Sequence, residues 1–463
     1  MVIAITSILG MAGYNCSKTW KDTMSTHSSL QKPARSGAKT IFSVTSGNFL
    51  EMYDFMVFGY YATAIAKTFF PGDDPFASLM LTLMTFGAGF LMRPLGAIIL
   101  GAYIDHHGRR KGLLLTLGLM ALGTLTIALV PGYATLGAAA PILILLGRLL
   151  QGFSAGVELG GVSVYLAEVA PKGRKGFYVS WQSGSQQVAV IFAALLGLAL
   201  NHLLAKDAVT EWGWRIPFVV GCLIVPFLFW IRRMLEETEA FSQRKSHPSM
   251  GQIVRSVGQN WALVLAGMLM VVTTTVMFYM ITAFTPTFGK TVLLMSDKQS
   301  FLVTLFVGIS NLFWLPVMGA LSDRIGRRPL LIVFTILMIL TTWPVLHGLV
   351  GSPTFAHLVE AELWLSFLYA SYNGAMVVYL AEIMPAEVRA SGFSLAYSLA
   401  TALFGGFTPA ISSYLIHATG DKAMPGVWLS FAAVCGLAGT LLIGRMVKQY
   451  QAQHTAAPVG APL

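Results

Sequence analysis

The feature that most constrains the fold is a series of long apolar segments separated by short polar breaks. Each segment is about 20–30 residues long, enough to cross a bilayer as a helix. Because backbone groups in lipid must bond within the protein, only helices and closed barrels can span it, and these segments lack the alternation of barrel strands. The sequence therefore predicts an all-α membrane protein with twelve transmembrane helices. The approximate spans are 41–69, 76–104, 112–131, 137–165, 177–203, 214–232, 259–288, 296–321, 328–350, 356–382, 390–416 and 424–446.

Composition and charge placement agree with this class. Only 11% of the residues are charged and 55% are hydrophobic, whereas a soluble domain carries about 25% charged residues. The net charge of +10 does not indicate a nucleic-acid partner, because the basic residues lie in the breaks between apolar segments. With the N-terminus in the cytoplasm, 17 basic residues of these breaks fall inside and 6 outside. The positive-inside rule then predicts a multi-pass protein with both termini in the cytoplasm.

The chain consists of two related halves. Its longest polar break, 233–258, divides the apolar segments six and six. Gly-Ala-Tyr-Ile-Asp-His-His-Gly-Arg-Arg-Lys (101–111) matches Gly-Ala-Leu-Ser-Asp-Arg-Ile-Gly-Arg-Arg-Pro (319–329), and Ala-Glu-Val-Ala-Pro (167–171) matches Ala-Glu-Ile-Met-Pro (381–385). Two motifs that recur at nearly one offset indicate a duplicated six-helix unit. The predicted parts are a cytoplasmic tail (1–40), a six-helix bundle (41–232), a linker (233–258), a second bundle (259–446) and a second tail (447–463).

Ionisable residues inside the apolar segments are the first functional candidates, because a charge at membrane depth is costly. The first half contains Glu51, Asp54, Arg93, Arg148 and Glu158. In the second half, the acidic positions 360, 362 and 382 lie nearer the ends of their segments. We therefore expect the charge chemistry in the first six helices.

Arg93 and Arg148 are the candidates for binding carboxylates, since guanidinium can donate two parallel hydrogen bonds to a carboxylate. The Arg93-Pro94 pair is alternatively a helix kink with a structural arginine. Neutral contacts are expected from side chains that share helix faces, although helix packing explains the same residues: Gln182, Gln186, Tyr369, Tyr372 and Asn373.

Asp54 and Arg148 can form an ion pair if their helix faces meet. A carboxylate beside a cation binds a proton less tightly than one whose cation has moved to an anionic substrate. Such a pair would link substrate binding to proton uptake, with Glu51 and Glu158 as further proton-binding candidates. The alternative is a static structural salt bridge.

Motifs of other classes are missing from the sequence. It contains no phosphate-binding GxxxxGK[ST], no zinc-ligand spacing and no G-x-S-x-G elbow. We therefore expect neither an enzyme nor a metal site nor a cofactor, and uphill transport would draw on an ion gradient.

Several stretches carry a family resemblance. The two G-x-x-x-D-x-x-G-R-R segments resemble the loop signature of the major facilitator superfamily. Residues 46–55, 90–96 and 147–158 resemble its metabolite:proton symporters. Residues 157–166, 180–189 and 211–218 look like those of bacterial citrate–proton symporters and the related tricarballylate carriers. The chain has Met52 where the citrate carriers have glutamine, which leaves tricarballylate open.

The resemblance implies two six-helix bundles that work by alternating access in a bacterial inner membrane. It also implies a pairing of a helix 1 acid with a helix 4 arginine. The loop motifs would latch the halves in the outward-facing state, although their arginines also suit a purely topogenic role. The latch residues are Asp105, Arg109, Arg110, Asp323, Arg327 and Arg328.

The sequence thus predicts a monomeric symporter that takes up a tricarboxylate, citrate first, together with protons. Tricarballylate, another organic acid or an osmolyte is the alternative within the family. A non-transporting receptor on the same fold is the alternative from another class, and a channel is disfavoured by the duplicated halves.

Overall fold

The computed structural model describes residues 45–455 except 46, 108, 157, 234–257, 259 and 385–388. All regular secondary structure in these ranges is helical. The predicted N-terminal tail, nearly all of the linker and residues 456–463 lie outside the described residues. Residues 447–455, which we expected in the C-terminal tail, continue the last helix.

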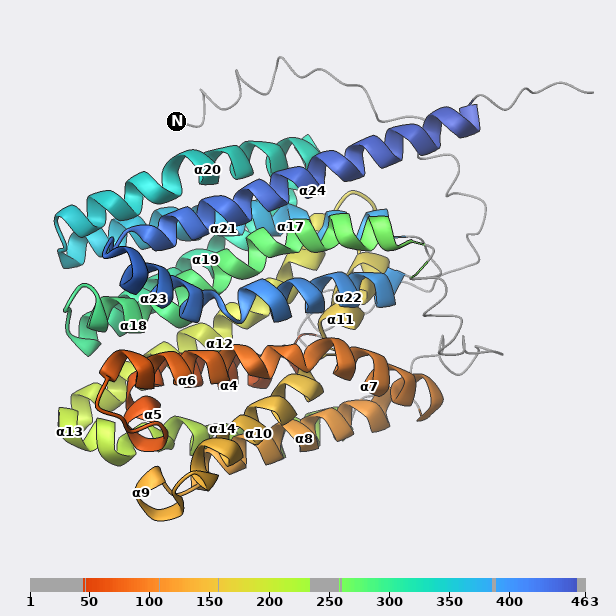
Figure 1. Ribbon diagram of the computed structural model, residues 1–463. Coiled ribbons are helices and arrows are strands. Elements are labelled where there is room, and N and C mark those ends of the chain that lie inside the picture. Colours follow the sequence, from red (N-terminus) through yellow and green to blue (C-terminus); the bar gives the residue numbers. More distant parts are fainter. Residues whose placement is uncertain are drawn as a thin grey trace, which may run out of the picture. The chain divides into compact units, whose positions relative to one another are not determined.

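The first half contains eleven α-helices and one π-helical segment among the described residues. Their arrangement can be followed in Figure 1. They are α4 (Gly47–Tyr60), α5 (Ala62–Phe69), α6 (Pro75–Leu91), α7 (Arg93–His107), α8 (Arg109–Leu129), α9 (Tyr133–Leu136), α10 (Ala139–Ala155), α11 (Glu158–Val169), α12 (Lys175–Leu203), α13 (Lys206–Ala208), η1 (Val209–Gly213) and α14 (Arg215–Arg233).

The second half repeats this arrangement with longer helices and two further π-helical segments in the part of the chain that is described. They are α17 (Trp261–Tyr279), η2 (Met280–Phe284), α18 (Thr285–Thr291), α19 (Asp297–Ile325), α20 (Arg327–Gly351), α21 (Phe355–Ile383), α22 (Arg389–Ala400), η3 (Thr401–Gly405), α23 (Thr408–Thr419) and α24 (Met424–Thr455).

These helices account for all twelve predicted segments. Within the described ranges, eight helices are long and apolar enough to cross a membrane, and a pair bent by 50° between 206 and 230 makes a ninth. Two shorter apolar helices, Leu114–Leu129 and Ala139–Ala155, fall in the third and fourth segments. The first segment is divided at Tyr61 into α4 and α5. The predicted all-α fold of twelve membrane helices is confirmed.

The outward faces of the helices are apolar. Leu223 of α14 and Leu340 of α20 are 71% and 63% exposed, and many other large aliphatic and aromatic side chains are exposed like them. A water-soluble protein does not present apolar surface on this scale. The described surface therefore fits a surrounding of lipid chains.

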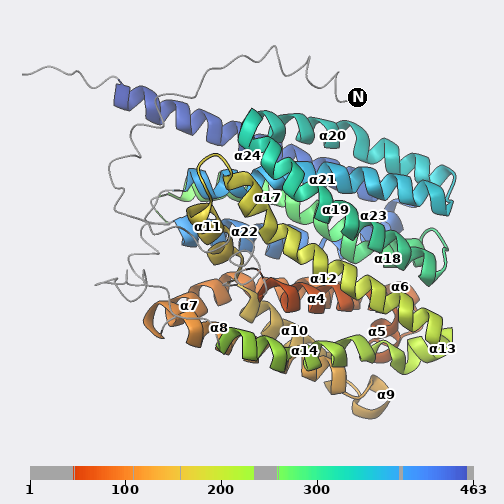
Figure 2. The same ribbon diagram turned by 180° about the vertical axis from the view of Figure 1, so that it is seen from behind.

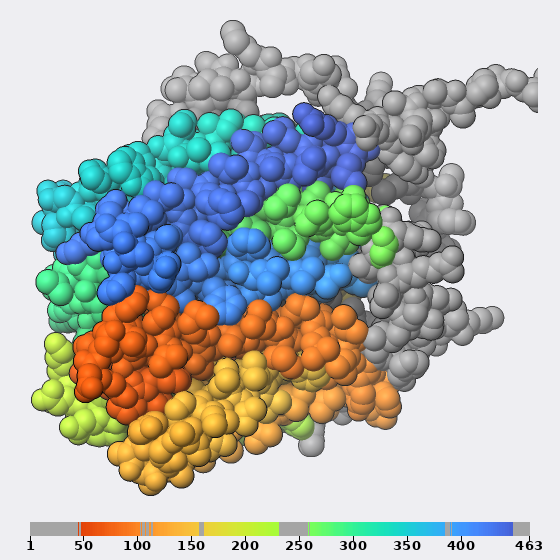
Figure 3. All heavy atoms as spheres, in the orientation of Figure 1, coloured from red at the N-terminus to blue at the C-terminus, as the bar shows by residue number. Residues whose placement is uncertain are grey.

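Each half forms a helix bundle, and the two bundles contact each other through several pairs of helices. The first half occupies one side of Figure 3 (red to yellow-green) and the second half the other (green to blue). The most extensive contact joins α12 of the first half to α19 of the second, and the two run side by side in Figure 2. Further contacts join α4 to η2, α6 to η3 and α23, and α7 and α11 to α22.

Glycines allow the two halves to approach closely. A Cβ atom on Gly176 of α12 would lie 2.2 Å from the carbonyl oxygen of Gly319 in α19. A Cβ atom on Gly319 would in turn lie 2.5 Å from the carbonyl oxygen of Gly176. Small residues at such crossings let helix backbones pack directly. The contact between α12 and α19 therefore depends on this pair.

Two phenylalanine–glycine contacts join α6 to the helix that contains η3, and we call this pair of contacts the interlock. The ring of Phe407 lies 2.4 Å from the position of a Cβ atom on Gly87, and the ring of Phe90 lies 2.4 Å from that on Gly406. Each helix thus places one phenylalanine over a glycine of the other. Two large rings fit at this crossing only because both facing positions lack a side chain.

Gly326 makes the turn between α19 and α20 with a φ of 100°, a conformation that side chains with a Cβ atom rarely adopt. This explains the glycine of the second G-R-R motif. Its counterpart in the first motif, Gly108, lies outside the described residues.

Candidate functional site

The candidate site is built on α4, which is buried by contacts with α12, α14 and η2. Glu51, Asp54 and Phe58 follow one another at spacings of three and four, so they share one face of the helix. All three side chains are buried. A helix with two carboxyl groups on a buried face requires polar partners from its neighbours.

Glu51 forms a buried ion pair with Arg93. Nη2 of Arg93 donates to Oε1 of Glu51 at 2.7 Å, and both side chains are at most 3% exposed. Arg93 reaches this position because α6 ends at Leu91 and α7 begins at Arg93. The Arg-Pro pair therefore lies where α7 begins, after the single residue Met92 that separates it from α6.

The pair that we expected between Asp54 and Arg148 does not form directly. Gln151, one turn after Arg148 on α10, stands between them. Nη1 of Arg148 donates to Oε1 of Gln151 at 2.8 Å, and Nε2 of Gln151 donates to Oδ2 of Asp54 at 3.4 Å. The Thr124 hydroxyl of α8 also donates to that carboxylate oxygen. The acid–arginine pair of this site is Glu51–Arg93 instead.

Aromatic rings surround the two guanidinium groups. Both lie over the ring of Phe55, with the central carbons of Arg93 and Arg148 at 4.9 and 4.4 Å from its centroid. Arg93 also lies over Phe90 at 4.6 Å, and Arg148 over Phe58 at 4.5 Å. Cation–π contacts hold both charges near one point between α4, α6, α7 and α10.

Arg148 is fully buried and retains unused hydrogen-bond donors. Its exposed fraction is 0%, and neither Nε nor Nη2 has a hydrogen-bond partner among the described residues. The same holds for Nε of Arg93, for Oδ1 of Asp54 and for both amide atoms of Asn48. Buried polar atoms are nearly always bonded, so these groups are candidates for binding a polar ligand.

α12 contributes amides to the contact with the second half. Nε2 of Gln182 has no partner within the described chain, and Gln186 is also buried. Gln187, which follows it, accepts a hydrogen bond at 3.2 Å from Asn311 of α19. The hydroxyl of Ser366 donates to the Asn311 oxygen at 2.8 Å. This network connects α12, α19 and α21 across the halves.

The α21 residues predicted to contact the substrate, Tyr369, Tyr372 and Asn373, differ in their hydrogen bonds. Nδ2 of Asn373 donates to the hydroxyl of Tyr369 at 3.3 Å, and Oδ1 of Asn373 has no partner in the described part of the chain. Tyr372 instead donates to the carbonyl oxygen of Met270 at 3.0 Å and lies against Gly436. Its geometry favours helix packing within the second half over ligand contact. For Glu158, the first residue of α11, only the backbone is described.

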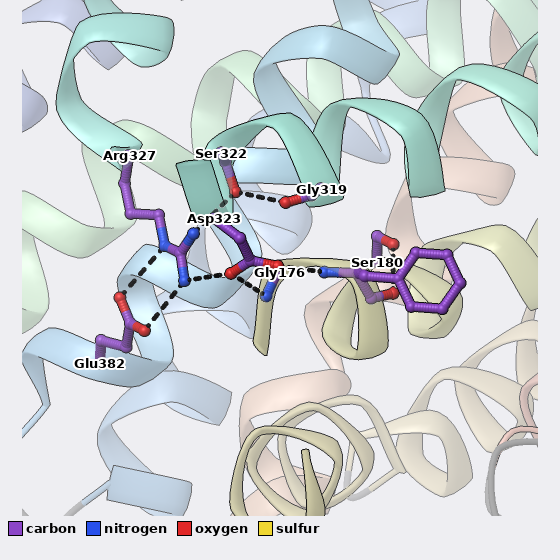
Figure 4. A network of polar contacts seen from close by, with 8 residues as sticks. Gly176, Ser180, Gly319, Ser322, Asp323, Arg327 and Glu382 are labelled. Carbon is purple, nitrogen blue, oxygen red and sulfur yellow. Dashed lines mark hydrogen bonds and ion pairs between the residues drawn. The ribbon is translucent and has the colours of Figure 1, made fainter. Parts of the chain in front are cut away.

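At the loop-motif end of the helices, Asp323 binds the first turn of α12 (Figure 4). Its carboxylate accepts hydrogen bonds from the backbone N–H groups of Gly176 at 2.8 Å and Phe177 at 3.1 Å. A carboxylate is favoured at a helix N-terminus by the unpaired N–H groups and the helix dipole. Asp323 belongs to the second half and α12 to the first, so this contact joins the halves.

The motif arginines do not cross that boundary in the described residues. Arg327 pairs with Asp323 at 2.8 Å and with Glu382 of α21 at 3.2 Å, all within the second half (Figure 4). Arg328 lies against Gly444 of α24. Arg327 thus orients Asp323, while Arg328 packs on the last helix. The side chains of Asp105, Arg109 and Arg110 lie outside the described residues.

Asn48 and Thr124 were not among the predicted site residues, and Glu362 was noted in the sequence but not counted as a candidate. Asn48 precedes Glu51 by one helical turn, and its spacing could have indicated the shared face. Thr124 is an ordinary hydroxyl within an apolar segment and gives no signal. Glu362 was placed near a helix end, yet it is 1% exposed. The described residues contain no group of His, Cys, Asp and Glu side chains that could hold a metal.

A twelve-helix membrane protein with two packed halves and charges buried between its helices has the architecture of a secondary transporter. The model of the Major Facilitator Superfamily matches residues 44–409. The citrate-proton symporter of Klebsiella pneumoniae is 62% identical over 412 residues, which cover 89% of this chain and 92% of that protein. The citrate-proton symporter of Salmonella typhi is 59% identical over 429 residues, 92% of this chain and 99% of that protein.

The fold agrees with these relatives. The crystal structure of a D-xylose-proton symporter matches with a TM-score of 0.70 at 19% identity, covering 88% of this chain and 97% of that one. The chain belongs to the Major Facilitator Superfamily. The expected resemblance is confirmed over most of the chain.

Proposed function

We propose that this protein is a proton-coupled symporter that takes up a tricarboxylate, citrate first, by alternating access. The observation that supports this most is the buried Arg148, which has unused donors and forms no ion pair with any described residue. A buried cation without an anion is unfavourable. A carboxylate of the substrate would neutralise it and accept its hydrogen bonds.

The second guanidinium fits a substrate with several carboxylates. Arg93 shares the Phe55 ring with Arg148, so one small polyanion can contact both. Asn48, Gln182 and Asn373 carry amide atoms without partners among the described residues, and amides suit hydroxyl and carboxylate groups. Citrate and tricarballylate differ by one hydroxyl group, so these amides are the place where the two would be distinguished.

Charge balance provides the coupling. The site contains two cations, Arg93 and Arg148, and two carboxyl groups, Glu51 and Asp54. An anion that enters this buried site adds negative charge, which protons on the two carboxyl groups can offset. A substrate carboxylate that takes Arg93 displaces Glu51, and the displaced carboxyl group then binds a proton more tightly. Substrate and protons would therefore bind together.

The remaining features follow from the same proposal. The protein would function as a monomer in the bacterial inner membrane with both termini in the cytoplasm. It would require no cofactor besides the coupling proton and catalyse no covalent reaction. The two relatives named as citrate-proton symporters support transport over a receptor role.

Labelled citrate uptake into proteoliposomes tests the proposal. Unlabelled citrate, tricarballylate, 2-oxoglutarate and betaine would be added as competitors. We expect the two tricarboxylates to compete most strongly, because only they can occupy both arginines and leave a third carboxylate for the amides. If betaine blocked the uptake of labelled citrate and unlabelled citrate did not, the proposed substrate class would be contradicted.

A further inference from the structure

A third buried carboxyl group, Glu362, lies in the second half, where the proposed site has only neutral residues. It is located two turns inside α21 and is 1% exposed. The Thr285 hydroxyl of α18 donates to its Oε1 at 2.7 Å, while its Oε2 has no partner among the described residues. A buried carboxyl group with one donor and no cation requires a functional explanation.

The other titratable groups of α21 and its neighbouring helices interact with residues other than Glu362, are exposed or lie at another level of the bundle. Lys290 of α18 pairs with Asp297 of α19 at 3.0 Å, and the ring of Tyr279 in α17 packs on Phe90. Titratable residues near the outer ends of α12, α19, α20 and α21 are exposed: His202, Lys298, His347, His357 and Glu360. Those of α11 and α22, Glu168 and Arg389, lie toward the end of the bundle where Asp323 is found. In the described structure, Thr285 is the one hydrogen-bond donor to Glu362.

Thr285 has a second acceptor. Its hydroxyl also lies 3.3 Å from the carbonyl oxygen of Met280, the first residue of the π-helical segment η2. A hydroxyl group has one hydrogen, so it cannot bond fully to both oxygens. When Glu362 is ionised, the shorter bond to its carboxylate takes that hydrogen. When Glu362 is protonated, its own O–H can donate to Thr285, which leaves the threonine hydrogen for Met280.

The segment that receives this hydrogen bond touches the helix with the proposed proton-coupling residues. A Cβ atom on Gly59 of α4 would lie 3.1 Å from Ala283 in η2. Asp54 is located on the same helix, five residues before Gly59. A change in the hydrogen bonding of η2 therefore acts directly on a contact between the halves. π-Helical turns occur frequently at functional sites.

We propose that Glu362 is a further proton-binding residue of the transport cycle, and that Thr285 transmits its protonation state to η2 and α4. This inference rests on the proposed function. It adds one proton site in the second half to the two carboxyl groups of the first.

The test compares Glu362→Gln with wild type in proteoliposomes. Two quantities are measured: citrate counterflow at equal pH, which needs no net proton movement, and the proton-to-citrate ratio from the reversal of flux in opposed gradients. We expect counterflow within about twofold of wild type and a ratio lower by one proton. Glu362→Asp should restore the ratio, and Glu360→Gln, an exposed change on the same helix, should leave it unaltered.

An unchanged proton-to-citrate ratio in Glu362→Gln would overturn the inference. Absence of counterflow in the wild type would contradict the proposed function instead. If Glu362→Gln does not fold, Thr285→Val and Thr285→Ser decide the question. The valine variant should slow gradient-driven uptake about tenfold while the serine variant stays near wild type, and equal rates in both would reject the role of the hydroxyl.

Discussion

At the scale of single residues, the site places each arginine in a different situation. Arg93 is paired with Glu51, whereas the guanidinium of Arg148 donates to Gln151 and lies over aromatic rings. The two arginines would therefore contribute to substrate binding in different ways. Arg148 is free to accept a carboxylate at once, and Arg93 becomes available when Glu51 releases it.

Replacing Arg148 with alanine should abolish measurable citrate binding. Truncating one partner of a buried charged contact costs about 2–5 kcal/mol, or roughly 30-fold or more in affinity. Arg148→Lys should recover part of the loss, because it keeps the charge but not the two parallel donors. Isothermal titration of the purified protein would measure both variants. Unchanged affinity in Arg148→Ala would exclude the assigned role.

Replacing Glu51 with glutamine should flatten the pH dependence of citrate binding. If binding takes up a proton at Glu51, affinity falls as pH rises, by up to about tenfold per pH unit for each proton taken up. The variant has no proton to take up there, so its slope should be lower by as much as one. Affinity measured across a pH series against wild type checks this, and equal slopes would assign the proton elsewhere.

Residue identities in the site were largely predictable, but their pairing was not. Glu51, Asp54, Arg93 and Arg148 stand out because charges are rare in apolar segments. Which acid meets which arginine depends on helix rotation and on the break at Met92, and periodicity alone defines neither. Gln151 between Asp54 and Arg148 illustrates this, since a one-turn neighbour of the arginine took the place of a direct contact.

At the scale of helices, close crossings depend on glycine. The interlock of Phe90 over Gly406 and Phe407 over Gly87 fixes α6 against the helix that contains η3. Phe90 also lies under the guanidinium of Arg93. A disturbance at this crossing would therefore reach the proposed site.

A methyl group at Gly406 should reduce transport. Its Cβ atom would lie 2.4 Å from the Phe90 ring, which must move away. We expect Gly406→Ala to slow citrate uptake about tenfold, consistent with about 1–3 kcal/mol for overpacking. Gly118→Ala on α8 is the matched control, because a Cβ atom there meets nothing within 4 Å. Equal uptake by both variants would show that the interlock does not limit transport.

The positions of the helices were predictable where the apolar run was long, and their interruptions were not. The sequence predicted continuous segments at 41–69 and 137–165, but the first is divided at Tyr61 and the second between α10 and α11. Three π-helical segments were not predicted either. They lie within segments that are apolar on most faces, where a change of helical phase leaves no mark in the sequence.

At the scale of the whole molecule, contacts between the halves occur at both ends of the helices. Asp323 joins α19 to the first turn of α12 at one end, and the ring of Phe76 in α6 stacks on His417 of α23, with centroids 3.8 Å apart, at the other. Alternating access requires these contacts to break in turn. Their relative strength would determine which side of the membrane the site faces.

Removing the Asp323 carboxylate should favour opening at its end of the molecule. Hydrogen bonds to a charged group contribute about 1.5–3 kcal/mol each, so losing two would shift the equilibrium by roughly a hundredfold or more. Distances between spin labels on α12 and α19 would report the shift in Asp323→Ala. Glu382→Gln is the control, because the pair of Glu382 with Arg327 remains within the second half. Equal distributions in wild type and Asp323→Ala would show that this contact is not a latch.

The central claim, that tricarboxylate and protons move together, is tested most directly by measuring proton entry during citrate uptake. Proteoliposomes with a trapped pH-sensitive dye, no imposed gradient and no sodium would receive external citrate. The account predicts acidification of the interior that requires citrate, disappears in Arg148→Ala and is abolished by a protonophore. Citrate entry without acidification, or entry that requires sodium, would contradict it.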